Sequence, residues 1–479
     1  MGKDNLKGKT QKGLYWTFLN QFVTYGMQFV IGIIMARMLS PEDYGITALP
    51  AVFISIAAIF VDCGFGNALI RKPNLSEQDL STAFYYSIII GVVCYVILFF
   101  ASSIIASFYA TPIIEKLMRI TALTFLWAPL ATPQRILLNR RLDFKTSTKI
   151  NITTRLIAGI IGISVAYYGY GIWALVISSL ISSMLDTFLN WFIVRWLPST
   201  KWSKESFRYL WGYGNKLMAS SFLNALFNNI TPIFIGKFYS KSELGVYNRA
   251  LGYANLPSQN FTQAIRSVTF PVLSKIQDDT ERLVYNYRRM LKVMCFVVFP
   301  MMLILAGLAK PIIILMLTEK WIACIPLLQI LCFSQMWYPL AAINLNLLQV
   351  KGRSDLFLRL EIIKKGIMLV VMFITLPIGV EAFCYGCVVA SILDIGVNTY
   401  YTGKLIKVGF IRQLKDVSTS LSASLLIFFF LINFIKITPN VYFQIFGGTI
   451  ISGILYLGIS YTFRFSELND LKFILNRNK

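Results

Sequence analysis

Arginine side chains occur within stretches of the sequence that are otherwise apolar. Arg155 has Asn151 one helical turn before it and Gly159 one turn after it, so small and polar groups would share its face of a helix. Arg249 is followed one turn later by Tyr253. A guanidinium can hold two oxygens of a phosphate or carboxylate at once, which makes both arginines candidates for binding an anion. The alternative for each is a buried ion pair or a packing role.

These two arginines belong to a larger set of charged residues within apolar stretches. The cations are Arg135, Arg155, Lys216, Arg249, Arg266, Lys292, Lys364 and Lys365, and the comparable acids are Asp62, Asp186, Glu361 and Asp394. A charge at mid-bilayer costs at least about 2.5–3.5 kcal/mol, so such residues should face a cavity or pair with one another. Those near helix ends can instead reach the aqueous surface. Glu361 and Lys365 have the spacing of a helical ion pair, and Asp62 or Asp186 could pair with an arginine.

Polar side chains recur at helical spacing in two places, two hundred residues apart. The first stripe is Asn20, Thr24 and Gln28, and the second stripe is Ser220, Asn224 and Asn228. The spacing i, i+4, i+8 places each set on one helix face, which should contact protein or water rather than lipid. Hydrogen bonding between packed helices is one explanation. The recurrence favours the other, in which both stripes line one central cleft.

A second sequence pattern repeats at the same offset without a gap. ARMLSPEDYGITAL at 36–49 aligns with GKFYSKSELGVYNR at 236–249, so that Ser40 matches Ser240 and Gly45 matches Gly245. Six expected membrane spans separate the two copies, which gives both copies the same orientation. The pattern indicates a parallel repeat of six helices, and two such lobes around a shared cleft are typical of alternating-access transporters.

Composition sets the class of protein to which these patterns belong. The 479 residues are 56% hydrophobic and 14% charged, whereas soluble domains usually carry about 25% charged residues. We therefore expect an all-α integral membrane protein with no cleavable signal peptide, formed by two six-helix lobes at 1–200 and 201–408 and an appendage at 409–479. About fourteen transmembrane helices are expected near 14–39, 44–63, 82–108, 114–137, 147–168, 171–195, 209–236, 244–273, 287–308, 321–349, 355–377, 380–402, 417–435 and 441–463.

The net charge of +23 has a topological explanation that does not require nucleic acid. Most lysines and arginines fall in the termini and in the even-numbered loops, and such an excess marks the cytoplasmic side. Arg140, Lys145 and Lys204 are examples. Both termini should therefore be cytoplasmic. The chain contains no histidine, and we expect no metal site and no cofactor.

Several longer motifs resemble a family of bacterial polysaccharide exporters, the Wzx/WzxC type. They are QRILLNRRLDF at 134–144, YGYGIWALV at 168–176, LGVYNRAL at 244–251, VTFPVLSKIQDD at 268–279, AKPII at 309–313 and EKW at 319–321. Their order and spacing resemble the family over nearly the whole chain, and the last two helices match least well.

The resemblance implies membership of the multidrug/oligosaccharidyl-lipid/polysaccharide exporter superfamily, which also contains MATE drug exporters and lipid II flippases. It implies a fourteen-helix, two-lobed fold with a cationic cavity in the inner membrane. The implied substrate is an oligosaccharide on undecaprenyl diphosphate, moved to the periplasmic leaflet for O-antigen, capsule or exopolysaccharide synthesis. Other assembly proteins, such as a polymerase, are implied as partners.

Three other functions can be weighed against this expectation. A MATE-like, cation-coupled multidrug exporter would need embedded carboxylates, whereas cations here outnumber acids. A polysaccharide polymerase or ligase would need large external loops, but the expected external loops are the shortest. A scaffold protein would not need polar, proline-containing helices. Coupling to Na⁺ or H⁺ through Asp62, Asp186 or Asp394 stays open.

Overall fold

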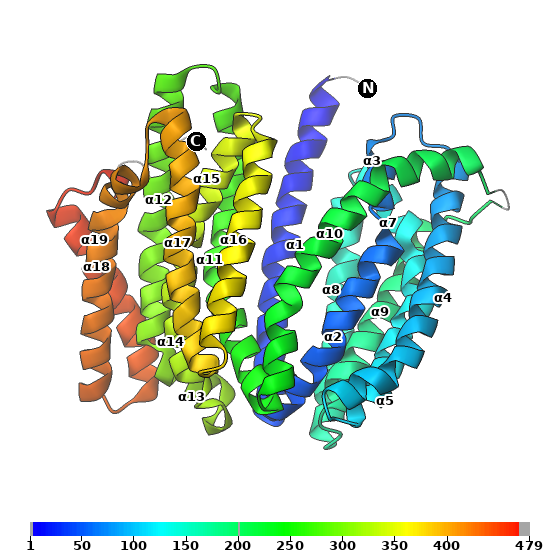
Figure 1. Cartoon of the computed structure of the whole chain (residues 1–479), viewed down its shortest axis with the longest axis horizontal. Coiled ribbons are helices and arrows are strands. Elements are labelled where there is room, and N and C mark those ends of the chain that lie inside the picture. Colours follow the sequence, from blue (N-terminus) through cyan, green and yellow to red (C-terminus); the bar gives the residue numbers. More distant parts are fainter. Residues whose placement is uncertain (1–2, 200–201, 469–479) are drawn as a thin grey trace. The chain divides into compact units, whose positions relative to one another are not determined.

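The computed structural model describes residues 3–199 and 202–468, and the chain divides into two compact units, Met1–Gly245 and Val246–Lys479. The elements of the first unit are α1 (Lys3–Met38), α2 (Pro41–Asp62), α3 (Phe65–Arg71), α4 (Glu77–Phe108), α5 (Ile113–Ala122), α6 (Thr124–Trp127), the 3₁₀ turn η1 (Ala128–Ala131), α7 (Thr132–Arg140), α8 (Phe144–Tyr167), α9 (Trp173–Val194) and α10 (Lys204–Phe238). Figure 1 shows this unit as a set of helices joined by loops.

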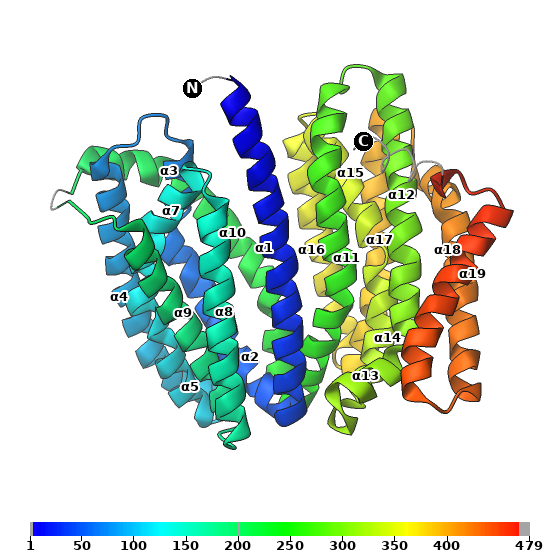
Figure 2. The same ribbon diagram turned by 180° about the vertical axis from the view of Figure 1, so that it is seen from behind.

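The second unit begins at Val246, inside α11 (Lys241–Lys275). The first turn of this helix belongs to the first unit. Its further elements are α12 (Thr280–Gly307), α13 (Ala309–Leu317), the 3₁₀ turn η2 (Glu319–Trp321), α14 (Cys324–Gln335), α15 (Tyr338–Val350), α16 (Ser354–Thr375), α17 (Val380–Ile406), α18 (Phe410–Ile437), the π-helical η3 (Phe443–Gly447) and α19 (Gly448–Thr462). Figure 2 shows α18 and α19 as a neighbouring pair, and α18 also packs along α12.

The all-helical membrane fold is confirmed. Within the described residues, ten helices are long and apolar enough to cross a membrane. Each of the fourteen expected ranges falls on a helix or on a run of short helices. The expected ranges that miss the length and hydropathy criteria include 209–236 and 244–273, which are rich in polar residues. The count of fourteen membrane crossings therefore stays a prediction.

Two of the expected helices are broken into shorter pieces. The range 114–137 contains α5, α6, η1 and α7, and Pro129 and Pro133 are the second residues of the last two. The range 321–349 contains α14 and α15, with Pro339 at the start of α15. Proline lacks the N–H that continues a helix and fits its first turn, so each break coincides with a new start. Both breaks fall in the fourth helix of a six-helix repeat.

Packing within the first unit does not follow the repeat boundary. α1 packs along α8, whereas α10, the expected first helix of the second repeat, packs on α2 and α3. The sequence repeat and the packing of the chain are thus different properties. The lobe boundary expected between residues 200 and 201 remains a prediction.

The repeated phrase forms the same local structure twice. Ser40 and Asp43 exchange hydrogen bonds, since the Ser40 N–H donates to the Asp43 carboxylate at 2.9 Å and the Asp43 N–H donates to the Ser40 hydroxyl at 3.2 Å. Ser240 and Glu243 repeat this arrangement at 3.0 and 3.1 Å. Each is a capping box, which satisfies two free N–H groups at the start of a helix. The conserved serine and acid of the two copies therefore set the sharp starts of α2 and α11.

Candidate functional site

Helices α1 and α8 run parallel to each other and lie in direct contact. The Thr148 hydroxyl donates to the carbonyl oxygen of Trp16 at 3.2 Å. Eleven residues later, a Cβ added to Gly159 would lie 2.3 Å from Cδ1 of Ile31, so this glycine allows the close approach of the two helices. These two contacts fix the register of α8 on α1.

Arg155 lies on the same face of α8 as these contacts. Thr148, Arg155 and Gly159 are spaced i, i+7, i+11, which is one face of a helix, and the first and last of them contact α1. The register places Arg155 level with the part of α1 that carries Thr24 and Gln28. Among the residues that the structure describes, Arg155 has no ion pair, and its side chain is half-buried. The structure therefore brings this arginine to the helix that carries the first polar stripe.

The first stripe is divided between packing and exposure. The Thr24 hydroxyl is buried and donates to the Asn20 side-chain oxygen at 3.2 Å. Gln28 is exposed and Asn20 is half-buried. Thr24 is therefore the member of this stripe that is least accessible to a ligand.

The second stripe lies on α10 and is exposed throughout. Ser220, Asn224 and Asn228 all expose their side chains. The neighbouring Asn229 instead turns to the protein, donating to the carbonyl of Ala225 at 2.8 Å and to the Ser55 hydroxyl of α2 at 3.4 Å. The second stripe is therefore exposed, whereas the adjacent Asn229 contacts α2. That both stripes face one cleft stays a prediction.

Arg249 lies in the second unit, in α11. Its guanidinium carbon lies 5.8 Å from the centre of the Tyr253 ring and 5.6 Å from the centre of the Trp321 ring. A cation over aromatic faces is stabilised electrostatically. The ring of Trp321 comes from the EKW motif and is fully buried, so Arg249 contributes to packing as well as charge.

Most other embedded cations contact acids or polar groups. Arg135 pairs with Asp186. Lys364 forms an ion pair with Glu361 at 2.5 Å, and the expected pairing of Glu361 with Lys365 stays a prediction. Asp186 was considered above as a possible partner for Arg155 or Arg249. It pairs with Arg135 instead.

Lys292 and Arg266 have partners in the second unit. Lys292 lies 3.9 Å from Asp416, which also accepts two hydrogen bonds from Arg288, at 2.6 and 2.7 Å. The Arg266 guanidinium donates to the Gln349 side-chain oxygen at 2.9 Å. Their charges are thus partly offset within their own unit.

The two glycines of the repeated phrase contact each other's helix. A Cβ added to Gly45 would lie 1.7 Å from the carbonyl oxygen of Lys241, and one added to Gly245 would lie 1.9 Å from the carbonyl oxygen of Pro41. The backbones of the first turns of α2 and α11 thus touch each other. Each glycine lies against the backbone of the other copy of the phrase. The two copies of the phrase thus form the two sides of one backbone contact.

The residues described by the structure contain no group of three potential metal ligands, and the seven cysteines are buried thiols. Burial suits cysteine as a small apolar packing residue. Coupling to Na⁺ or H⁺ remains an open expectation.

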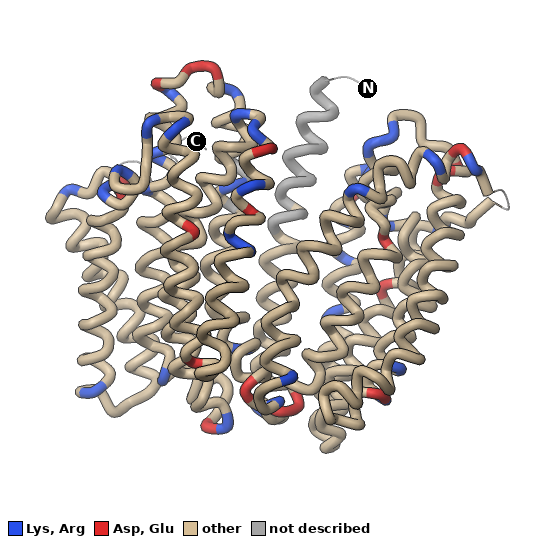
Figure 3. The backbone as a smooth tube through the Cα atoms, in the orientation of Figure 1, with Lys and Arg blue, Asp and Glu red and all other residues tan. Residues whose placement is uncertain are grey.

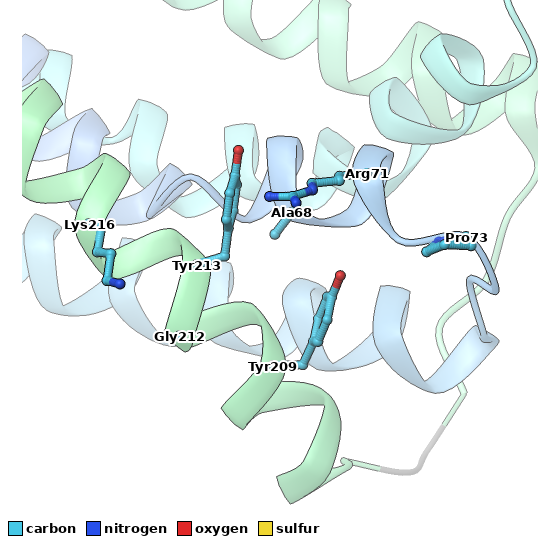
Figure 4. A pocket seen from close by; sticks show the side chains of 7 residues that line it. All are labelled: Ala68, Arg71, Pro73, Tyr209, Gly212, Tyr213 and Lys216. Carbon is cyan, nitrogen blue, oxygen red and sulfur yellow. The ribbon is translucent and has the colours of Figure 1, made fainter. Parts of the chain in front are cut away.

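Sequence reasoning did not find a pocket between α3 and α10. It is lined in part by Arg71, Tyr209, Tyr213 and Lys216 (Figure 4). The spacing of Tyr209, Tyr213 and Lys216 on one face of α10 was available as a signal. Arg71 lies in another helix far away in sequence, and its place in this group depends on the tertiary structure.

Thiol labelling can separate the roles of the stripe residues. With cysteine introduced singly, we expect a membrane-impermeant, water-soluble thiol reagent to label positions Gln28 and Asn228, and to label Thr24 poorly. Cysteine at Ile104 or Phe100, which are exposed apolar side chains of α4, should stay unlabelled because lipid excludes the reagent. Equal protection at Gln28, Asn228 and the two α4 positions would contradict the cavity role.

Comparison with known proteins supplies independent information about the chain. A family model described as "Polysaccharide biosynthesis protein" matches residues 34–326. The teichuronic acid biosynthesis protein TuaB of Bacillus subtilis is 28% identical over 72% of this chain and 72% of its own length. The lipopolysaccharide biosynthesis protein WzxC of Escherichia coli is 27% identical over 75% of this chain and 74% of its own length.

Solved structures show the same fold. The lipid II flippase MurJ in an inward closed conformation superposes with a TM-score of 0.75 at 19% identity, covering 93% of this chain and 98% of that one. This chain therefore shares its overall fold with that solved structure.

Proposed function

Because the chain belongs to the polysaccharide biosynthesis protein family, whose model matches more than half of it, we propose that it is a flippase for undecaprenyl-diphosphate-linked oligosaccharide. The chain is a multi-pass membrane transporter of polysaccharide biosynthesis and not an enzyme. In the proposed reaction, the lipid-linked glycan moves from the cytoplasmic to the outer leaflet by alternating access, for O-antigen, capsule or exopolysaccharide synthesis.

This proposal rests on the position of Arg155, which lies on the face of α8 that contacts α1 and forms no ion pair among the described residues. A diphosphate crossing the low-dielectric part of a membrane loses its hydration, and a fixed cation offsets part of this cost. A cation already paired with an acid is less able to do so, and Arg155 has no such acid among the described residues. Its guanidinium can bind two phosphate oxygens at once.

The rest of the substrate suits the polar residues near this arginine. Glycan hydroxyls can exchange hydrogen bonds with amide and hydroxyl side chains. The two stripes and Asn151 supply such side chains. The polyprenyl tail is apolar and can remain in lipid throughout. The binding residues proposed are therefore Arg155, Arg249, Asn151 and the exposed members of the stripes.

The proposed direction requires a defined orientation in the membrane. We assign the termini and the start of α8, which contains Lys145, to the cytoplasmic side, because the excess of lysine and arginine marks that side. Figure 3 shows that, within each unit, most lysines and arginines gather at one end of the helices.

This orientation predicts the labelling of two positions in the first turns of α8 and α11. Cysteine at Lys145 should react only with a membrane-permeant reagent in intact cells, and cysteine at Ser242 should react with an impermeant one. Labelling of both positions from outside would contradict the orientation.

Deletion of the gene tests the function in the producing cell. We expect loss of surface polysaccharide and accumulation of lipid-linked oligosaccharide in the cytoplasmic leaflet. Accumulation in the outer leaflet would instead indicate a later polymerase or ligase step, and unchanged surface polysaccharide would contradict the proposal.

A further inference from the structure

The first unit contains a pocket of about 530 Å³ between α3 and α10, and its residue Lys216 lies one helical turn before Ser220 of the second stripe. It is lined by Ala68, Arg71, Pro73, Tyr209, Gly212, Tyr213 and Lys216. Figure 4 shows the rings of Tyr209 and Tyr213 projecting from α10 toward α3, where the Arg71 side chain lies. Two cations and no acid line this space.

Backbone features hold the two walls of the pocket together. Gly64 has a positive φ of 67°, which turns the chain sharply between α2 and α3. A Cβ added to Gly214 would lie 2.3 Å from the carbonyl oxygen of Cys63, so glycine allows α10 to touch this turn. The two helices therefore approach each other closely at one end and leave the pocket at the other.

Arg140 fixes the loop that ends α3. Its guanidinium donates to the carbonyl oxygens of Leu69 at 2.7 Å, Lys72 at 2.5 Å and Pro73 at 3.2 Å. These carbonyls lie at the end of a helix, where no helical N–H can reach them. Arg140 belongs to the QRILLNRRLDF motif, and this contact gives it a positioning role for the wall that carries Arg71.

The charges around the pocket favour an anion. The Arg71 guanidinium carbon lies 5.3 Å from the centre of the Tyr213 ring, and the Lys72 ammonium lies 5.0 Å from the centre of the Tyr209 ring. The nearby acid Asp79 is buried and pairs with Lys72 at 2.7 Å. Arg71 and Lys216 are exposed, so they are accessible to a ligand.

Aromatic residues indicate the depth of the pocket in the membrane. Trp202, Tyr209 and Trp211 expose 46%, 44% and 39% of their surface in the first turns of α10 and just before it. Tryptophan and tyrosine gather at the level of lipid head groups. At that level, on the expected cytoplasmic side, the available anion is the phosphate of a lipid.

We propose that this pocket binds the phosphate-bearing head group of a lipid in the cytoplasmic leaflet. Arg71 and Lys216 would neutralise the phosphate, and the two tyrosines would contact the group attached to it. Two lipids carry this chemistry, namely the polyprenyl diphosphate of the substrate and an anionic phospholipid. The first would make the pocket a loading site, which rests on the proposed function, whereas the second would not depend on it.

Native mass spectrometry of the purified full chain tests this site without measuring transport. The probes are undecaprenyl diphosphate, phosphatidylglycerol and phosphatidylcholine at equal concentrations. The pocket variant is R71Q/K216Q, and the matched control is R141Q/K204Q, which removes two exposed cations of the same expected side outside the pocket. Thermal melting of each variant verifies folding.

We expect the wild type to retain undecaprenyl diphosphate, phosphatidylglycerol or both in preference to phosphatidylcholine. R71Q/K216Q should weaken retention of that lipid about tenfold, because hydrogen bonds to charged groups are stronger than those between neutral groups. The control should stay within about twofold of wild type. The lipid that loses more identifies the source of the phosphate. Equal weakening in both variants, or retention of phosphatidylcholine as strong as that of the anionic lipids, would overturn the site. Failure of the proposed transport function would leave these binding results unchanged.

Discussion

Replacing Arg155 by alanine is expected to reduce surface polysaccharide by at least about tenfold while leaving the amount of folded protein near normal. A hydrogen bond to a charged group contributes about 1.5–3 kcal/mol, and each 1.4 kcal/mol corresponds to a factor of about ten. Folding should tolerate the change because the described residues provide no ion pair that the substitution would break. Surface glycan normalised to protein in the membrane is the measurement.

Two further substitutions separate charge from geometry and function from folding. R155K should restore part of the export if charge alone matters, and little if the planar guanidinium matters. R135A is the matched contrast, because Arg135 pairs with Asp186. R135A should lower the amount of folded protein, and D186N should restore it, since an unpaired embedded charge is costly. Full export by R155A would remove Arg155 from the mechanism.

Arg249 should behave differently from Arg155. R249A should also reduce export, but with some loss of thermal stability, because its guanidinium packs over the rings of Tyr253 and the buried Trp321. R249K keeps the charge and should preserve more stability than R249A.

Alanine at Gly45 or Gly245 is expected to abolish most of the export. The added Cβ would overlap a backbone carbonyl oxygen at 1.7 or 1.9 Å, and no side chain can rotate away to relieve this contact. The first turns of α2 and α11 would have to separate, at a cost of about 1–3 kcal/mol for such overpacking. We expect the proposed alternating-access cycle to depend on this contact, so that forcing the two helix starts apart blocks transport.

Other glycines of the chain provide controls for the glycine substitutions. A Cβ at Gly26 or Gly252 would meet nothing within 4 Å. G26A and G252A should therefore export normally and melt at the same or a higher temperature, because alanine favours helix by about 1 kcal/mol over glycine. Export at the wild-type level by G45A and G245A would show that the close contact is dispensable.

The helices and the repeat could be predicted from the sequence because they depend on local patterns. Long apolar runs indicate spans, and the phrase shared by 36–49 and 236–249 is visible without a structure. The capping boxes also have a local signature, since in each copy a serine is followed three residues later by an acid. The broken helices were not predicted, because Pro129, Pro133 and Pro339 lie within apolar runs long enough to suggest one continuous helix.

The site required information that no local pattern contains. The contact of Gly45 with the first turn of α11 joins residues that are far apart in the chain, and so does the pocket formed by Arg71 with Tyr213. The difference between Arg155 and Arg135 likewise depends on which helix approaches each of them. Composition places both arginines in the membrane, whereas only the packing shows that Arg135 already has an acid beside it.

Reconstitution of the purified chain tests the central claim most directly. Liposomes would contain lipid-linked oligosaccharide from the producing cell, and a lectin outside would report the glycan exposed on the outer leaflet. With the wild-type protein, the fraction protected in the inner leaflet should become accessible with time, whereas vesicles containing R155A should stay close to protein-free vesicles. Equal protection in wild-type and protein-free vesicles would contradict the proposal that this chain flips a lipid-linked oligosaccharide.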